Sequence, residues 1–408
     1  PMAGNFLQQE NVVLTGACEA IVVDVQCIFP ALGPLSKCFH TKFITTSPIA
    51  QMPDAEFIRF NAETAGENAK AIVKMAIDNF KNRKPELVHI PQLKQKATVG
   101  YSVEAIVKVL DGVTNSQVDE TGTTKPLLEC ITSGVIRGAV AMVGCNNPKI
   151  RPDYAHIELM KKCIANDIVV IASGCSAQAA AKAGLMDKSA KDLCGAGLKR
   201  VCELADIPPV LHMGSCVDIS RMMILAAELA KDSGLNISQL PVVGCAPEWM
   251  SEKAVSIGNY VIGTGIDTFL GVDPYASGSS EMVEWLTNGT RDIVEAAYTV
   301  ETDIEKLVDK MIERIEEKRT ALEKLGMHPE LMLCPATGRV LTVISSVHEY
   351  IKDGKTMNLL HISVSLKNRN PNWDEMCFVK EKLLGDEMPA VQFHPPRSEY
   401  VNEHEHCL

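Results

Sequence analysis

Five cysteines in this chain each stand at the end of a short apolar run with the composition of a β-strand, and no other feature constrains the fold as strongly. They are Cys27, Cys145, Cys175, Cys216 and Cys245, after runs at 20–25, 138–143, 168–172, 209–211 and 241–243. An open α/β sheet binds ligands outside the carboxyl ends of its strands, so these thiols are expected to converge at one sheet edge. The alternative is that each cysteine is a small buried hydrophobic residue. Because five share the same position, the pattern predicts one thiol-lined site.

Composition narrows what such a site would hold. The chain has 408 residues, a net charge of −11 and no basic stretch, which argues against a nucleic-acid partner. No apolar run approaches the roughly twenty residues of a membrane span and no signal-peptide pattern opens the sequence, so we expect a cytoplasmic protein. Its 14 cysteines are then unlikely to form a disulfide framework, and no CxxC pair of the zinc type occurs. A metal cluster with thiolate ligands from separate loops remains.

Strands that alternate with helices predict the fold class. The apolar runs are hydrophobic throughout, which is typical of parallel sheets covered on both faces. We therefore predict an α/β protein with doubly wound, Rossmann-like parallel sheets in two domains and a small α+β appendage at the C-terminal end. Helices are expected at 63–80, 102–110, 126–133, 157–166, 252–258 and 304–324. Strands are expected at 20–25, 43–46, 135–143, 169–171 and 240–243, with a further strand region at 261–271.

Changes in composition suggest the domain boundaries. The basic segment 84–96 contains Pro85 and Pro91 and is a candidate boundary. The predicted domains are 1–93, 94–326 and 327–408, and the last is expected to hold strands at 340–345, 359–366 and 391–393 and a helix at 373–384. The closing residues His394, His404, His406 and Cys407 suggest a zinc site, but their irregular spacing favours a solvated tail.

Lys253 is the residue best placed to move protons at a thiol site. It lies just after the strand at 241–243, so its ammonium group would face the same crevice. A lysine near a cationic cluster has a lowered pKa, which suits a general acid or base. The alternative is an ordinary solvated surface lysine, and the residues alone leave both open.

Six motifs in order over about residues 1–326 resemble the catalytic subunit of anaerobic nickel–iron carbon monoxide dehydrogenase. They are Asp24-Val25-Gln26-Cys27-Ile28, Gly144-Cys145-Asn146-Asn147, Gly174-Cys175, Met186-Asp187, PPVLHMGSCVD at 208–218 and SEKAVSIG at 251–258. The run at 208–218 is highly specific. The resemblance implies that 1–93 is the remainder of a middle Rossmann-like domain and 94–326 a C-terminal one. Residues 327–408 match nothing in the family, and 373–401 is faintly similar to a small phage-type domain of unknown role.

The resemblance also implies which residues form the site. Cys27, Cys145 and Cys175 would each hold an iron of the cubane part of a nickel–iron–sulfur cluster, and Cys216 would bind nickel. Lys253 would be the acid/base, and Ile257 would shape the wall where CO approaches. The family's reaction converts CO and water reversibly to CO2, two protons and two electrons. The cysteines that match no family ligand are expected to pack in the interior: Cys194, Cys202 and Cys245.

Further expectations concern partners and missing parts. The resemblance implies a homodimer, a ferredoxin-like electron carrier and, as a further candidate, an acetyl-CoA synthase subunit. The family's pendant-iron ligands, its 4Fe–4S relay ligands and the histidines of its proton path lie upstream of the matching motifs, so they are expected to be absent here. Cys18, and Cys38 with His40, are the nearest candidates for a replacement iron site. Activity of this chain alone is therefore doubtful.

The sequence leaves two functions open. One is a portion of a functional carbon monoxide dehydrogenase, and the other is a non-catalytic iron–sulfur-binding or scaffold descendant of that family. A nucleotide-binding doubly wound domain is disfavoured, because no GxGxxG follows a strand. Metal analysis of anaerobically purified protein bears most directly on the choice.

Overall fold

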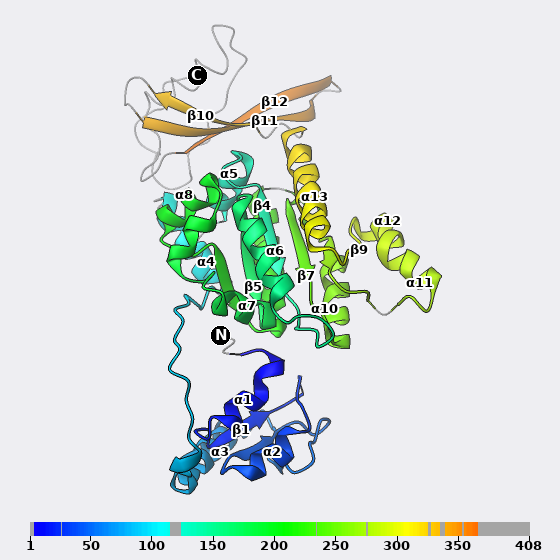
Figure 1. Cartoon of the computed structure of the whole chain (residues 1–408). Helices are drawn as coiled ribbons and strands as arrows, with labels where there is room; N and C mark the ends of the chain where they lie inside the picture. The colour runs from blue at the N-terminus through cyan, green and yellow to red at the C-terminus, as the bar shows by residue number, and fades with distance from the viewer. Residues whose placement is uncertain are drawn as a thin grey trace.

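The computed structural model describes residues 4–25, 27–114, 124–233, 235–274, 276–324, 328–334, 339–352 and 355–365, and the structural statements below concern these residues. They form a six-stranded sheet and two three-stranded sheets. The six-stranded sheet and the N-terminal three-stranded sheet belong to two bodies, which a long extended segment joins (Figure 1).

The larger body is built on a parallel sheet with strand order β6-β5-β4-β7-β8-β9. Its strands are β4 (Gly138–Met142), β5 (Ile168–Ser173), β6 (Val210–Gly214), β7 (Val242–Ala246), β8 (Thr268–Leu270) and β9 (Tyr298–Val300). The chain places β5 and β6 on one side of β4 and then returns to place β7 on the other side. The pair β4 and β7 is therefore the topological switch point, where doubly wound sheets bind their ligands.

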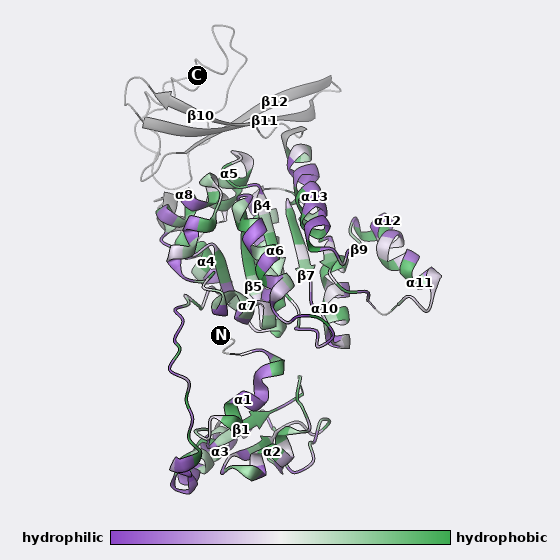
Figure 2. Cartoon of the chain, viewed as in Figure 1, coloured by the Kyte–Doolittle hydropathy of each residue, from purple (hydrophilic) through white to green (hydrophobic). Residues whose placement is uncertain are grey.

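Burial explains why these runs form strands without polar alternation. Every residue of β5, β6 and β7 is buried, as expected for a parallel sheet covered by helices. In Figure 2 the sheet is accordingly hydrophobic. The helices of this body are α4 (Val103–Thr114), α5 (Lys125–Thr132), α6 (Tyr154–Ala165), α7 (Gly174–Lys182), α8 (Ala196–Ala205), α9 (Ile219–Ser233), α10 (Glu252–Gly263), α11 (Ser280–Glu284), α12 (Arg291–Val294) and α13 (Ile304–Lys324). Helices α6 and α13 pack together against β4, whereas α9 packs with α4 and α5. The predicted α/β class with parallel sheets is confirmed.

The smaller, N-terminal body contains the parallel strands β1 (Ala20–Val23), β2 (Lys42–Thr45) and β3 (Glu56–Phe57). Its helices are α1 (Gln9–Leu14), α2 (Leu32–Cys38) and α3 (Ala65–Asn79). A small core of Val13, Leu32 and Phe43 holds it together. Residues 88–98, where no helix or strand forms, lead to the larger body, and they overlap the segment 84–96 that the sequence suggested as a boundary. The domain limits themselves stay a prediction.

Helix α3 forms where the sequence predicted an amphipathic helix, but several of its apolar residues are exposed. A helix does form within 63–80, but its apolar residues Val73 and Ile77 are 58% and 67% exposed, and Phe80 just beyond it is 59% exposed. The only buried residue of α3 is Asn79, whose amide donates to the carbonyl oxygen of Glu19 at 2.8 Å. The described part of the N-terminal body therefore leaves these apolar residues uncovered.

Two other expectations need correction. The strand region predicted at 261–271 is mostly not a strand, because α10 continues to Gly263 and β8 covers only Thr268–Leu270. Cys245 does not end its strand but lies inside β7. Beyond Lys324, the strands β10 (His328–Cys334), β11 (Arg339–Lys352) and β12 (Lys355–Ser365) pair antiparallel. They contain the predicted strand 340–345 and residues 359–365 of the one predicted at 359–366, whose last residue lies outside the described residues. The helix at 373–384, the strand at 391–393 and the terminal histidines lie outside the described residues.

Within the described part of the chain, we find no helix with both the length and the apolar character that crossing a bilayer requires.

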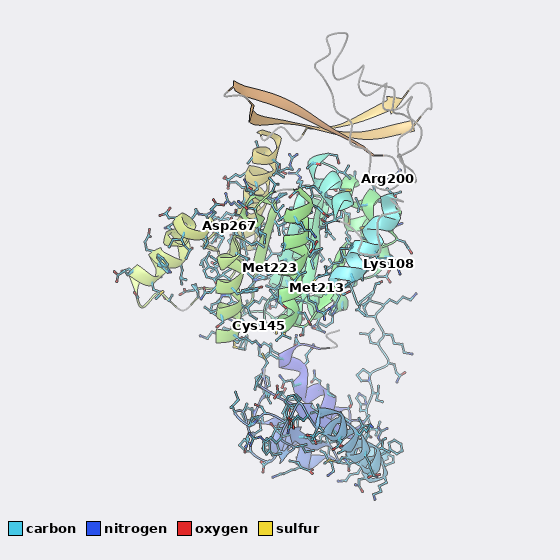
Figure 3. The ribbon with its side chains drawn as sticks, turned by 180° about the vertical axis from the view of Figure 1, so that it is seen from behind. Lys108, Cys145, Arg200, Met213, Met223 and Asp267 are labelled. Atoms are coloured by element: carbon cyan, nitrogen blue, oxygen red, sulfur yellow. The ribbon has the colours of Figure 1, made fainter. Side chains whose placement is uncertain are left out.

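A buried carboxylate ties helix α13 to the end of the large sheet opposite Cys145 (Figure 3). Asp267, just before β8, is 1% exposed and contacts Arg314 at 2.7 Å, Arg291 at 2.8 Å and Lys318 at 3.5 Å. Burial alone would raise the pKa of Asp267, but the three cations outweigh it and hold that pKa below its usual value. The carboxylate is therefore charged in the folded chain and anchors α13.

We expect Asp267→Asn to lower the free energy of unfolding by about 3 kcal/mol at neutral pH, because Lys318 is left buried without its counter-charge. The pKa of Asp267 is lower in the folded than in the unfolded chain, so its stabilisation is complete above about pH 4 and is lost as the pH falls through the folded value. The stability difference between wild type and variant, measured by denaturant unfolding, should therefore shrink on acidification below about pH 4. A difference that is constant with pH would contradict the assignment.

Candidate metal centre

A cavity of about 690 Å³ lies where the N-terminal body meets the carboxyl ends of the large sheet. Four of the five strand-end cysteines line it, together with the two other residues that the resemblance assigned to the site: Cys27, Cys145, Cys175, Cys216, Lys253 and Ile257. Figure 3 shows Cys145 at the edge of the larger body that faces the N-terminal one. The cavity borders Gly144 after β4 and Gly244 in β7, so it sits at the switch point.

Three of the cavity thiols come from adjacent strands of one sheet. Cys145 follows β4, Cys175 is the second residue of α7 directly after β5, and Cys216 follows β6. The hydroxyl of Ser176 donates to the carbonyl oxygen of Met142 at 2.7 Å, which ties the start of α7 to the end of β4. The prediction that strand ends bring these thiols together agrees with the structure for this group.

Close backbone approach brings Cys216 to Cys175. Gly174 has φ +67°, and a Cβ atom added there would lie 3.2 Å from the Cβ of Cys216. Next to Cys216, the amide of Ser215 donates to the carboxylate of Asp218 at 2.7 Å, which fixes the turn that leads into α9. Only a residue without a side chain fits at position 174 without strain.

Cys27 reaches the cavity from a different sheet, because it follows β1 of the N-terminal body. The expectation that all strand-end thiols share one sheet edge is therefore wrong for this residue. Its φ of +50° lies in the left-handed region, which is unfavourable for a residue with a side chain. The Gln9 amide holds this turn, since its nitrogen donates to the carbonyl oxygen of Cys27 and its oxygen accepts from the amide of Phe29 at 3.4 Å.

Lys253 belongs to the larger body, but its side chain contacts Cys27 of the N-terminal body. Its Nζ donates to the Cys27 Sγ at 3.5 Å. Burial raises the pKa of the Cys27 thiol, and the positive charge of Lys253 works in the opposite direction. The pKa of Cys175 is raised by burial to about 12. Lys253 itself is half-buried and lines the cavity, so it is not a solvated surface lysine.

The thiols surround the cavity without converging on one point. Among the described residues, no three or more His, Cys, Asp or Glu side chains are grouped closely enough to hold a single metal ion. Each of Cys27 and Cys175 nonetheless interacts electrostatically with the other three cavity cysteines. Thiols spread around a cavity fit a polynuclear cluster, whose metals are bound one at each ligand, and thiolates are the ligands of iron–sulfur clusters.

The remaining cysteines that the sequence raised do not line the cavity. Cys245 is buried in the main core, where burial raises its pKa, so it packs as a hydrophobic residue. Cys194 and Cys202 interact with each other. In the N-terminal body, the Cys18 thiol donates to the Ala20 carbonyl oxygen at 3.3 Å, Cys38 is exposed, and His40 contacts Glu19 at 3.2 Å.

Sequence reasoning missed the polar residues that hold the thiols in place. Gln9 and Asp218 form backbone hydrogen bonds around Cys27 and Cys216, and Ser251 Oγ lies 3.6 Å from the Cys145 Sγ. Asp218 and Ser251 do belong to motifs of the resemblance, and Asp218 stands three residues after Ser215, a spacing typical of a capped turn. Gln9 has no such local signal, because its contact spans 18 residues of chain.

An α/β protein with a thiol-lined cavity at its switch point defines a candidate cluster-binding metalloprotein. Comparison with known proteins agrees: the model of the Prismane/CO dehydrogenase family matches residues 1–305, so the chain belongs to this family. A domain of unknown function matches residues 351–408.

Several relatives are carbon monoxide dehydrogenases. Carbon monoxide dehydrogenase 1 of Methanosarcina mazei is 50% identical over 322 residues, which are 79% of this chain and 50% of that protein. Carbon monoxide dehydrogenase 1 of Carboxydothermus hydrogenoformans is 42% identical over 331 residues, 79% of this chain and 51% of that protein. The structure of the enzyme from Thermococcus sp. AM4 superposes with a TM-score of 0.72 and 48% identity, over 79% of this chain and 50% of that chain. The chain thus spans about half the length of these relatives.

We expect Gly174→Ala to lower the free energy of unfolding by about 1–2 kcal/mol, because alanine is strained at this positive φ and its methyl group presses on Cys216. The rate of Cys216 alkylation in the metal-free chain should change as well. Gly66→Ala in α3 is the matched control, since nothing lies within 4 Å of its added Cβ and alanine favours helix. Equal stabilities of the two variants would show that Gly174 is not required for the close approach.

Proposed function

We propose that this chain forms the nickel–iron–sulfur site of a carbon monoxide dehydrogenase, which converts CO and water reversibly to CO2, two protons and two electrons. One observation carries the proposal: Cys27, Cys145, Cys175 and Cys216 line one cavity at the switch point together with Lys253. The cavity thiols are the ones that the resemblance to the family assigned as ligands, and this chain corresponds to about half the length of each relative.

The four cavity cysteines are the proposed ligands of the cluster metals. Cys27, Cys145 and Cys175 hold irons of the cluster and Cys216 holds nickel. When bound, the cluster supplies the metals that activate CO and water and accepts the two electrons. Cysteines coordinate metals as thiolates, so Cys27 and Cys175, whose thiol pKa values burial raises, release protons as the cluster assembles.

The protein's own residues position the reactants and handle protons. The Nζ of Lys253 lies at the cavity wall 3.5 Å from the Cys27 Sγ, where its ammonium form can give a proton to a molecule in the cavity and its neutral amine form can take one back. Ile257, one turn further along α10, supplies an apolar part of the wall. A largely apolar cavity suits CO, which has little polarity, and limits the access of bulk water.

The proposed reaction also requires partner proteins. Two released electrons need a carrier, and a ferredoxin-like protein fits that role. One solved relative, with a TM-score of 0.72 and 37% identity over 80% of this chain and 49% of that chain, comes from an acetyl-CoA synthase/carbon monoxide dehydrogenase, so an acetyl-CoA synthase subunit is a further candidate. A homodimer in the cytoplasm completes the proposal.

We expect Cys216→Ala to lose nickel and to keep iron, because three cavity thiols remain for the iron positions. Metal content of anaerobically reconstituted protein measures this directly. Cys245→Ala is the matched control: this thiol is buried in the core and does not line the cavity, so nickel and iron should both stay at wild-type levels. Full nickel occupancy in Cys216→Ala would refute the assignment of Cys216.

We expect the chain alone, reconstituted anaerobically with nickel, iron and sulfide, to reduce a viologen dye with CO far more slowly than a full-length relative assayed beside it. The described residues supply four cavity thiols and one lysine, and the relatives are about twice as long. Sustained turnover that disappears in Cys216→Ala would contradict this expectation. Cys18, and Cys38 with His40, would then be the first residues to test as ligands of a further iron.

A further inference from the structure

A buried carboxylate organises the loop that carries Cys145. Glu248 follows β7 and is 0% exposed. Its Oε1 accepts from the amide of Ala155 at 3.0 Å, in the first turn of α6, and its Oε2 accepts from the amide of Asp153 at 3.0 Å. The same Oε2 accepts from the side-chain amide of Asn146 at 2.9 Å. Glu248 therefore joins the start of α6 to the residue next to Cys145, and the positive end of the helix dipole compensates its charge.

A buried histidine completes the connection to Cys145. His156, in the first turn of α6, is 0% exposed, and its Nε2 lies 2.7 Å from the carbonyl oxygen of Cys145. A carbonyl only accepts, so Nε2 carries the hydrogen and donates it. The buried Nδ1 of the ring has no hydrogen-bond partner. The ring thus makes one directed hydrogen bond, and that bond ends on the backbone of Cys145.

We infer that Glu248 and His156 are positioning residues that fix the Cys145 thiol for the cluster. Glu248 sets where α6 begins, and His156 on α6 then holds the carbonyl group of Cys145. This inference rests on the proposed function, in which Cys145 binds an iron of the cluster. Neither side chain lines the cavity, so each acts through the loop and not by contact with a substrate.

The geometry favours positioning over packing alone. Gly144 has φ +103°, and a Cβ atom there would lie 3.1 Å from the Cβ of Ala246, so the backbone before Cys145 is pressed against β7. The loop is therefore restrained on three sides: by Gly144 against β7, by Asn146 on Glu248, and by the Cys145 carbonyl on His156. Partners outside the ligand set typically change metal affinity 10–100-fold when removed.

The test compares variants of the full chain in anaerobic assembly with ferrous iron and sulfide against an iron chelator. His156→Phe keeps the ring shape and loses the donor, so we expect its iron affinity to fall about tenfold or more. His156→Gln places an amide N–H near the position of Nε2 and should restore most of the affinity. Glu248→Gln presents an N–H to the donors that Glu248 accepts from and should behave like His156→Phe. The visible absorption and EPR signal of the bound cluster should change in the same order.

Asp232→Asn is the matched control for Glu248→Gln. Asp232, at the far end of α9, accepts from the amide and the hydroxyl of Thr124 at 2.8 and 2.7 Å, just before the start of α5. It thus resembles Glu248 as a carboxylate that holds a helix start, but it does not line or border the cavity. We expect Asp232→Asn to unfold at a lower temperature and to bind iron as wild type does.

Each remaining outcome has one meaning. Cys145→Ala distinguishes the ligand role of Cys145 from the positioning roles of Glu248 and His156. If this variant assembles the cluster normally, Cys145 is not a ligand and the positioning roles fail with it. If Cys145→Ala loses affinity while His156→Phe keeps it, the ligand set stands and the positioning roles are overturned. An equal loss in Asp232→Asn and His156→Phe would overturn them too, because general destabilisation would then explain both.

Discussion

The strand-order reversal at β4 and β7 is the constraint on which the site depends. The connections after β4 and β7 lead to opposite sides of the sheet, which opens a crevice beyond the carboxyl ends of this pair. Cys145 follows β4, while Lys253 follows β7 and reaches the same space from the other side. The parallel register then sets Cys175 and Cys216 beside Cys145, although they are 30 and 71 residues further along the chain.

Hydrogen bonds to the backbone, more than side-chain packing, hold the thiols around the cavity. Gln9 holds the left-handed turn at Cys27, Asp218 closes the turn at Cys216, and His156 holds the carbonyl of Cys145. A thiolate bonded to a metal has no free donor with which to position itself, so its orientation has to come from its backbone. Positioning side chains that are themselves buried lose little further entropy when a cluster binds.

The sequence predicted the parallel sheet and three of the thiols at its edge, because unbroken apolar runs followed by glycine turns are local signals. It failed where the deciding contact is distant. The apolar run alone grouped Cys245 with the other thiols, but its strand continues one residue further and Cys245 lies in the core, as the resemblance to the family implied. The apolar stripe of α3 predicted burial, yet which surface a helix meets depends on the rest of the fold. Glu248 and His156, 92 residues apart, carry no local signal of their contact.

Cys27 is the cavity thiol that its own body holds least firmly. The N-terminal body has a small core around Val13, Leu32 and Phe43, whereas one large continuous core supports the other three thiols. Phe6 from the N-terminal segment packs with Cys145 and Cys175, and Lys253 reaches back to Cys27, so the contacts between the bodies are made at the cavity itself. A ligand shared between the thiols of both bodies adds its binding energy to that contact, because it binds the docked arrangement and not the separated one. Under the proposed function, cluster assembly and docking of the two bodies are linked, and each stabilises the other by the same free energy.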